Sequence, residues 1–263
     1  MKKAGFLALA LAVICANAVT ARASILVNEN FNRDDGDLVG TNPTPGPGGT
    51  WAAHSGANGP VQINGNSIQI VQAASGTAAQ DVNVPAGGPM VAGDRWYASF
   101  DVVVEQPGAS LTSVYFAHFL QGTSNFTSRL WVTAGSQSGF RFALSNDSSI
   151  TNANGEVFSG DLVLGQSYRV VVSYDFTGQN GSLWIDQALE SGTSISATDP
   201  GFSNGVTAFA FRQGSPSGSL STTQTIDNLC VATTYNEAYN CVPEPGTIGL
   251  VGLAAMALIR RRR

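Results

Sequence analysis

Three aspartates crowd one short stretch near the start of the chain. Asp34, Asp35 and Asp37 lie in the segment NRDDGDL, whose composition favours a turn. Proteins bind calcium through oxygen ligands, which carboxylates commonly supply. The three aspartates are therefore candidate ligands of a structural calcium ion at this turn. The alternative is an Asp-rich turn that holds no ion.

The glutamates do not form the carboxylate pair that polysaccharide hydrolysis requires. Such enzymes place two carboxyl groups close together in one cleft, whereas the glutamates between the two ends of the chain occur singly: Glu29, Glu105, Glu156, Glu190 and Glu237. Asp101 and Glu105 share the polar face of one expected strand, and two solvated surface carboxylates explain this pair more simply. We expect no catalytic residues and no enzyme activity.

Signatures of other catalytic or cofactor sites are absent from the sequence. The only histidines are His54 and His118, and no Gly-x-Ser-x-Gly elbow is present. No His/Cys cluster suits zinc, and no phosphate loop or dinucleotide fingerprint occurs. The only cofactor that we consider is therefore the calcium ion.

Aromatic side chains are candidate sugar-binding residues, because a ring face can stack on the C–H face of a pyranose. The candidates are Trp51, Tyr97, Trp131 and Trp184. Packing in the core is the alternative for each of them. Tyr97 alternates with the apolar residues of its expected strand and so faces away from them. We select Trp51 and Tyr97 as the candidate ligand-binding residues.

Alternation with period two predicts the elements that position these residues. In residues 95–105, apolar side chains at every second position alternate with mostly polar ones, and residues 140–145 and 168–175 show the same pattern. Further strands are expected at 25–31, 67–72, 79–84, 114–120, 129–133, 181–186, 206–212 and 225–231, which gives about eleven in all.

Helix signals are nearly absent between the two ends of the chain. Strands with one apolar and one polar face are typical of antiparallel sheets that are buried on one side. We therefore predict an all-β fold with two antiparallel sheets packed as a β-sandwich. Residues 32–60, rich in Gly, Pro and Asn, are expected to form a surface loop around it.

The first residues read as a secretory signal peptide, residues 1–23. Two lysines precede an apolar run, and the small residues Ala21 and Ala23 predict cleavage before Ser24. Residues 16–18, Ala-Asn-Ala, offer a second cleavage site. The sequence therefore predicts a signal helix and export through the Sec machinery.

Two cysteines remain after the signal peptide is removed. Cys15 lies within the signal peptide and follows Ile14, where lipidation requires a small residue, so a lipoprotein is not favoured. Exported proteins meet an oxidising compartment, which makes a disulfide between Cys230 and Cys241 plausible. Two free thiols are the alternative.

The last residues combine three features that a soluble domain does not need. A rigid break, Pro243-Glu244-Pro245, precedes an uncharged run at 247–259 and a terminal block of four arginines, Arg260, Arg261, Arg262 and Arg263. A helix of that run reaches roughly 20 Å, against about 30 Å for the hydrocarbon core of a bilayer. The tail is therefore expected to form a short transmembrane helix with the arginines on the cytoplasmic side.

This order of features, residues 242–263, resembles the PEP-CTERM sorting signal of Gram-negative bacteria. The resemblance implies processing near the Pro-Glu-Pro sequence by an exosortase, a membrane-embedded transpeptidase-like enzyme. It also implies a membrane-anchored intermediate at the inner membrane, followed by delivery to the cell surface, outer membrane or extracellular matrix.

A second resemblance covers the domain itself. The segments ENF, DGDLVG and GTW near residues 29–51, SLWID at 182–186 and TIDNL at 225–229 are similar to laminin-G/concanavalin-like jelly rolls of bacterial surface proteins. Some jelly rolls share a structural ion between the first and last strands. Glu29 and Asp227 occupy those positions, so the resemblance adds them to the candidate calcium ligands.

The charge of the expected mature domain limits its partners. Removal of Lys2, Lys3, Arg22 and the four terminal arginines from 13 basic residues leaves six, all arginine; removal of Glu244 from 18 acidic residues leaves 17, a net charge of −11. Such a surface repels nucleic acid and suits divalent cations or neutral, hydroxyl-rich partners. Solubility outside the cell is the simpler explanation.

We therefore expect an exported, non-catalytic surface or matrix protein for adhesion or exopolysaccharide association. The alternatives are a polysaccharide hydrolase or lyase of the same fold, and a permanently membrane-anchored structural protein. The expected parts are a signal peptide at 1–23, a jelly-roll β-sandwich at 24–235, a linker at 236–241 and the sorting signal at 242–263.

Overall fold

The computed structural model describes residues 25–241, except 57, 73–78, 106–112, 147–149, 151–155, 198, 200–204 and 214–221. The predicted signal peptide with Ala21, Ala23 and Ser24, and the predicted sorting signal with its helix at 247–259, lie outside the described residues. The described part of the chain contains no helix with the length and apolar character of a membrane span.

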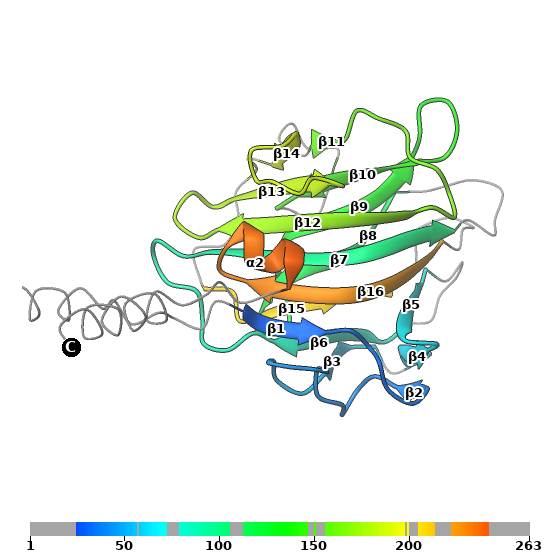
Figure 1. Ribbon diagram of the computed structural model, residues 1–263, viewed down its shortest axis with the longest axis vertical. Helices are drawn as coiled ribbons and strands as arrows, with labels where there is room; N and C mark the ends of the chain where they lie inside the picture. The colour runs from blue at the N-terminus through cyan, green and yellow to red at the C-terminus, as the bar shows by residue number, and fades with distance from the viewer. Residues whose placement is uncertain are drawn as a thin grey trace, which may run out of the picture. The chain divides into compact units, whose positions relative to one another are not determined.

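Two antiparallel sheets pack face to face as a β-sandwich, which confirms the predicted fold class (Figure 1). The larger sheet has the order β14-β13-β12-β7-β16-β5-β4-β2, and β1 pairs with β16. Its strands are β1 Ile25–Glu29, β2 Gly36–Asp37, β4 Gln62–Asn64, β5 Ser67–Val71, β7 Arg95–Glu105, β12 Ser167–Asp175, β13 Asn180–Ile185, β14 Ser194–Ala197 and β16 Thr223–Ala232.

The smaller sheet lies behind the larger one in Figure 1 and has the order β11-β10-β9-β8-β15-β6-β3. Its strands are β3 Ala52–Ser55, β6 Asp81–Pro85, β8 Val114–Gln121, β9 Asn125–Ala134, β10 Phe140–Ser145, β11 Glu156–Val157 and β15 Ala208–Phe211. We call the two layers the nine-stranded and the seven-stranded sheet.

The core lies between the sheets, where alternation predicts it. In β7 the alternating residues Trp96, Ala98 and Phe100 are buried in the main cluster, and Phe209 and Phe211 of β15 face them from the other sheet. The edge of the Phe100 ring meets the Phe211 ring face at 5.4 Å between centroids. Burial of these rings is the main favourable contribution to the stability of the sandwich.

Every strand that alternation predicts is present, with bounds shifted by a few residues. The short strands β2, β3, β4, β11 and β14 carry too few residues to show a period, and the sequence did not predict them. Residues 32–60 are not only a surface loop: they contain β2 and β3, and they bury Leu38 and Trp51 in the main core.

A β-bulge interrupts β16 at Asn228. Asp227 lies opposite Asp101 of β7, whereas Cys230, three residues later, lies opposite Ser99, so β16 carries one extra residue. Asn228 adopts a left-handed backbone with φ 54°, which asparagine tolerates better than most residues. The bulge re-aims the side chains of β16 on the outer face of the nine-stranded sheet.

The predicted linker at 236–241 is instead a short helix. Helix α2, Tyr235–Asn240, begins at Thr234, which accepts a hydrogen bond from the Glu237 N–H, and ends at Cys241 in a left-handed conformation. In Figure 1, α2 lies across the outer face of the nine-stranded sheet over β7, β12 and β16. It buries Tyr235 and Ala238 in a second apolar cluster on that face, so the domain extends to Cys241.

Candidate functional site

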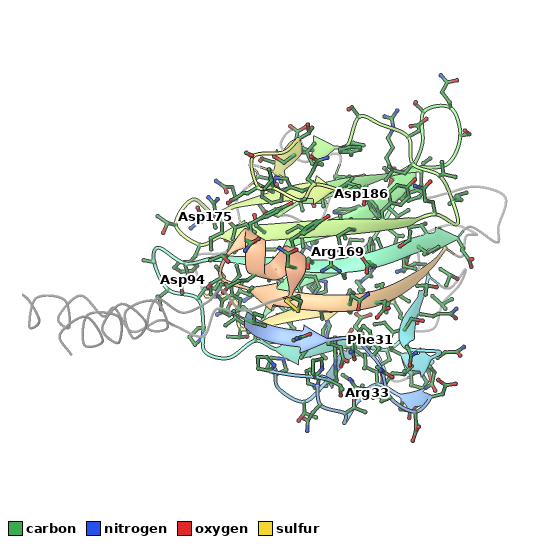
Figure 2. The ribbon with its side chains drawn as sticks, in the orientation of Figure 1. Phe31, Arg33, Asp94, Arg169, Asp175 and Asp186 are labelled. Atoms are coloured by element: carbon green, nitrogen blue, oxygen red, sulfur yellow. A yellow bond between two sulfur atoms is a disulfide. The ribbon has the colours of Figure 1, made fainter. Side chains whose placement is uncertain are left out.

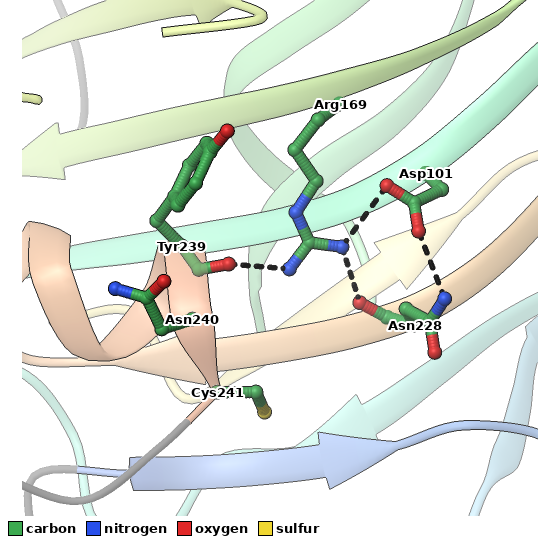
Figure 3. A pocket seen from close by; sticks show the side chains of 6 residues that line it. All are labelled: Asp101, Arg169, Asn228, Tyr239, Asn240 and Cys241. Atoms are coloured by element: carbon green, nitrogen blue, oxygen red, sulfur yellow. Dashed lines mark hydrogen bonds and ion pairs between the residues drawn. The ribbon is translucent and has the colours of Figure 1, made fainter. Parts of the chain in front are cut away.

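An open pocket of about 350 Å³ lies on the outer face of the nine-stranded sheet beside α2 (Figure 3). Three strands and the end of the helix form it. The adjacent strands β12, β7 and β16, the last at its bulge, each place a polar side chain side by side on this face of the sheet. Its lining residues are Asp101, Arg169, Asn228, Tyr239, Asn240 and Cys241.

The guanidinium of Arg169 is the centre of this pocket. Nη1 lies 3.3 Å from Oδ1 of Asp101 and donates to the Asn228 carbonyl at 3.0 Å. Nη2 donates to Ser99 Oγ and to the Tyr239 carbonyl, both at 2.9 Å. Arg169 therefore joins three strands to the last turn of the helix, and Figure 2 shows it beside α2.

The β16 bulge brings an amide to the pocket and a second carboxylate close to it. The Asn228 side-chain amide donates to Oδ2 of Asp101 at 2.8 Å, and Asp227 stands directly opposite Asp101 across the strand pair. Burial, together with the negative charges of Asp101 and Glu29, raises the pKa of Asp227. The pocket thus combines one cation, one carboxylate and two amides, which can hydrogen-bond a polyhydroxylated ligand.

A disulfide closes the pocket at the end of the domain. Cys230 of β16 and Cys241 are bonded, with Cα atoms 5.6 Å apart. The Cys241 N–H donates to the Glu237 carbonyl at 2.8 Å, and the ring of Tyr239 lies 5.9 Å from the Arg169 guanidinium. Residue 241 is therefore tied to the sheet by one covalent bond and to the helix by a hydrogen bond.

Tyr97 lies on the outer face, as predicted, but it is not an exposed sugar-binding ring. It is 5% exposed, because the rings of Trp184 and Tyr235 pack against it. Its hydroxyl donates to Glu190 at 2.6 Å. Burial and this hydrogen bond raise the pKa of Tyr97 to about 12. The prediction failed because helix α2, which covers this face, gave no sequence signal.

The other tryptophans are also buried. Trp51 is 1% exposed, lies between Phe31 and Phe211 in the main core, and donates from Nε1 to Glu29 at 3.0 Å. Trp131 and Trp184 are likewise buried. The selection of Trp51 as a ligand-binding residue was therefore wrong; core packing, the alternative, describes it.

Glu29, a predicted calcium ligand, has all of its contacts within the protein. One oxygen accepts the N–H groups of Phe31 at 2.7 Å and Thr44 at 3.3 Å; the other accepts Trp51 Nε1 and pairs with Arg33. The side chain is fully buried. Figure 2 shows Phe31 and Arg33 close to the end of β1. Through these contacts Glu29 holds the segment that follows β1 against the first strand.

The aspartates of the turn face different neighbours. Asp35 accepts the Gly65 N–H at 2.9 Å, Asp37 accepts the side-chain amide of Gln62, and Asp34 is exposed. Among the residues that the structure describes, no three His, Cys, Asp or Glu side chains are grouped so that they could hold a metal ion. The structure does not bring together the five predicted ligands.

Sequence reasoning missed the two residues that organise the pocket. Arg169 appeared only as one polar residue on an alternating strand, and its partners come from strands far away in the sequence. Asn228 gave a weak signal, because an Asp-Asn pair inside a strand pattern is typical of a turn or bulge. The candidate pair of Asp101 and Glu105 does not form a site; Asp101 faces Asp227 instead.

Comparison with known proteins identifies the tail. Residues 242–263 match the model of the PEP-CTERM protein-sorting motif. The chain thus carries the sorting motif that its last residues resemble. Such a motif implies export, a membrane-anchored intermediate and processing by an exosortase. No curated protein matches the sequence.

Comparison with solved structures identifies the fold. A structure titled "Cell entry of botulinum neurotoxin type C is dependent upon interaction with two ganglioside molecules" is 14% identical, with a TM-score of 0.55, over 83% of this chain and 51% of that chain. The binding domain of botulinum neurotoxin serotype D/C VPI 5993 is 13% identical, with a TM-score of 0.55, over 83% and 52%. This chain spans about half the length of these structures, and the likeness shows a shared β-sandwich.

Proposed function

We propose that this protein is exported, sorted by its PEP-CTERM motif to the cell surface or extracellular matrix, and associates there with polysaccharide through a non-catalytic β-sandwich. The sorting motif at 242–263 supports the route. The acidic, lysine-free domain and its open polar pocket support a neutral, hydroxyl-rich partner.

The observation that carries the proposal is where the folded domain ends. The last described residue, Cys241, is bonded to Cys230, and the motif begins at the next residue. Within the described residues, Arg169 and the disulfide hold the end of helix α2 on the sheet. Cleavage within the motif would therefore leave the contacts of the described domain intact, as an exosortase substrate requires.

The sorting step is tested in an exosortase-containing host with the full chain. The wild-type protein is expected at the cell surface or in the matrix with a shortened C-terminus, measured by fractionation and mass spectrometry. A variant with Pro243→Ala, Glu244→Ala and Pro245→Ala is expected to stay uncleaved in the inner membrane. Equal distribution and equal mass of the two proteins would refute sorting by this motif.

Polysaccharide association is tested with the mature protein on a glycan array and on exopolysaccharide of the host, with calcium and with EDTA. Saturable binding is expected. The variant Asn240→Ala should weaken it, because Asn240 lines the pocket. Asn236→Ala is the control: it removes the side-chain hydrogen bond between Asn236 and Asn240, keeps the one that Asn240 donates to the Asn236 carbonyl, and lies outside the pocket lining. Equal loss in both variants, or no binding at all, would contradict the pocket's role.

A polysaccharide hydrolase is the second candidate. The specific observation in its favour is that Asp227, whose pKa is raised mainly by burial, faces Asp101 beside an open pocket; glycosidases use two carboxyl groups close together. Release of reducing ends from the polysaccharides above, abolished by Asp227→Asn, would establish this candidate. Binding without release of reducing ends would exclude it.

A further inference from the structure

Both histidines of the chain lie together on the outer face of the seven-stranded sheet. His118 of β8 lies opposite Ala210 of β15, and Ala210 belongs to a small cluster apart from the main core. The rings of His118 and His54, which comes from β3, are 5.8 Å apart between centroids. Strands distant in the sequence thus bring the two imidazoles of the molecule to one point.

Neither imidazole has a hydrogen-bond partner among the residues that the structure describes. The four ring nitrogens are buried and without a partner. His118 is fully buried, and the side chain of His54 is 2% exposed. Nε2 of His54 lies 4.0 Å from Asp81, beyond hydrogen-bonding distance. Because a buried polar atom without a partner costs about 1–3 kcal/mol, a hydrogen-bonding group that reaches these nitrogens would stabilise the cluster.

The charges around the histidines favour an anion. Arg129 and Arg212 lower the pKa of His118, after the larger effect of burial, and Arg212 also contributes to lowering that of His54 to about 4. The same positive potential that disfavours a proton attracts an anion and repels a metal cation. The carboxylate of Asp81 lies near the same groups, 4.0 Å from His54 and within the electrostatic influence of Arg212, but its oxygens already accept the Ser55 hydroxyl at 2.5 Å and the Gln213 N–H at 2.9 Å.

Arg212 differs from most arginines of the domain. Ion pairs join Arg33 to Glu29, Arg95 to Asp175, Arg141 to Asp161 and Arg169 to Asp101. Within the described ranges, Arg212 forms no ion pair; its guanidinium lies 4.3 Å from the centroid of the Tyr115 ring. A guanidinium stacked on an aromatic face keeps its N–H groups available for a carboxylate.

Aromatic rings form the walls around these groups. The ring of Phe126 is tilted against that of His118 with 4.4 Å between centroids, and the ring of Tyr115 lies 5.1 Å from that of Trp131. The guanidinium of Arg129 lies 5.4 Å from the Tyr115 ring and 5.6 Å from the Phe126 ring. Tyr115 and Phe126 are partly exposed, so a ligand group can approach from their side while the histidines lie at the base. The packing holds the donors in fixed positions before any ligand arrives.

We propose that His54, His118, Arg129 and Arg212 form a binding site for a carboxylate group, with the guanidinium of Arg212 at its entrance and the two imidazoles at its base. Each neutral imidazole offers one N–H donor, and Arg212 adds a charge-assisted one. The carboxylate can come from a free organic acid or from an acidic sugar of a polysaccharide; only the second source rests on the proposed function, and it would make the polysaccharide acidic rather than neutral.

The test uses the full exported protein, labelled with ¹⁵N, because its only two histidines are the site. Imidazole ¹⁵N signals are recorded while free glucuronate is added, with glucose as the neutral control. Glucuronate should shift both signals in a saturable way and raise the pKa values of both rings, whereas glucose should not. Absence of shifts, or equal shifts with glucose, would overturn the proposal.

Variants assign the response to the site. Arg212→Gln should lower the affinity for glucuronate about tenfold, as expected for the loss of one charge-assisted hydrogen bond. The matched control is Arg141→Gln on β10 of the same sheet, where Arg141 pairs with Asp161. Equal loss of affinity in the two variants would indicate a nonspecific effect of charge and overturn the proposal.

A polymer series separates the two sources and separates this site from the proposed function. Polyglucuronate and neutral dextran are compared by the same imidazole signals. Shifts with glucuronate and polyglucuronate would support a site for acidic polysaccharide. Shifts with glucuronate alone would leave the carboxylate site in place for a free acid. Saturable binding of polyglucuronate without imidazole shifts would overturn this site and leave the association with polysaccharide standing.

Discussion

The two outer faces of the sandwich each carry an arginine-centred cluster, and the clusters differ in how far their hydrogen bonds are satisfied. On the nine-stranded sheet, Arg169 reaches Asp101, Ser99 and two backbone carbonyls. On the seven-stranded sheet, Arg212 stacks on Tyr115, and both histidines have unpartnered nitrogens among the described residues. The satisfied cluster holds the residues of its pocket in fixed positions, whereas the unsatisfied one still has hydrogen-bonding nitrogens to offer to a partner.

The largest effect on stability is expected from Arg169→Met. The substitution removes the charged partner of Asp101, which keeps only the Asn228 amide, and the donor to the Asn228 and Tyr239 carbonyls, which should lower the free energy of unfolding by about 3 kcal/mol. Urea unfolding of the variant and the wild-type protein measures this. A loss below about 1 kcal/mol would contradict the structural role of Arg169.

The disulfide is expected to contribute almost as much on the same face. The loop between Cys230 and Cys241 spans 11 residues, and the double variant Cys230→Ser, Cys241→Ser should lose about 2–3 kcal/mol. The melting temperatures of the wild-type protein with and without a reductant also measure the contribution of the disulfide. Unchanged melting in the double variant would show that α2 is held by its noncovalent contacts alone.

The histidine cluster should respond to pH. The pKa values of His54 and His118 lie below that of an unfolded histidine, so the unfolded chain binds these protons first and stability falls as the pH falls below about 6.5. Between pH 7 and 5.5 the loss should be about 1 kcal/mol for each histidine.

Urea unfolding across this pH range measures the effect. The double variant His54→Gln, His118→Gln should have a flatter profile than the wild-type protein, since glutamine does not titrate. Saturating glucuronate should reduce the loss in the wild-type protein, because a bound carboxylate stabilises the protonated rings. Identical profiles for variant and wild type would contradict burial of neutral histidines.

The smallest effect is expected from Arg212→Gln without ligand. Because Arg212 has no ion pair among the described residues, its loss should change the free energy of unfolding by less than about 0.5 kcal/mol, mainly through the contact with Tyr115. Urea unfolding beside Arg169→Met makes the comparison of the two faces direct. Equal losses of unfolding free energy in the two variants would show that the two arginine-centred clusters do not differ in their contribution to stability.

Most strands and the core could be predicted from the sequence, whereas the packing on the outer faces of the sheets could not. Alternation in β7 marks Trp96 and Phe100 as core residues because it follows directly from strand geometry. The burial of Tyr97 could not be predicted in this way, since it depends on helix α2, which packs on β7 although more than a hundred residues separate them. The two-residue alternation shows which side chains of one strand face the core. It does not show which distant segment packs on the other face of that strand.

The candidate sites show the same limit. Acidic residues that are close in sequence, such as Asp35 and Asp37, face different neighbours. His54 and His118 are separated by more than sixty residues and yet meet, because β3 joins β6, β6 joins β15 and β15 joins β8. The contact between the two histidines follows from the order of the strands in the sheet, and the alternation of residues along the sequence does not show that order.

The bond between Cys230 and Cys241 also has a mechanical consequence. A force that pulls on the chain beyond residue 241 enters the domain through the disulfide and acts on β16 rather than unwinding α2 turn by turn. Strand β16 is hydrogen-bonded to β7 along one edge and to β1 and β5 along the other. The hydrogen bonds of β16 to these neighbours resist the force together. A domain held by its C-terminal end in flowing liquid therefore resists unfolding from that end.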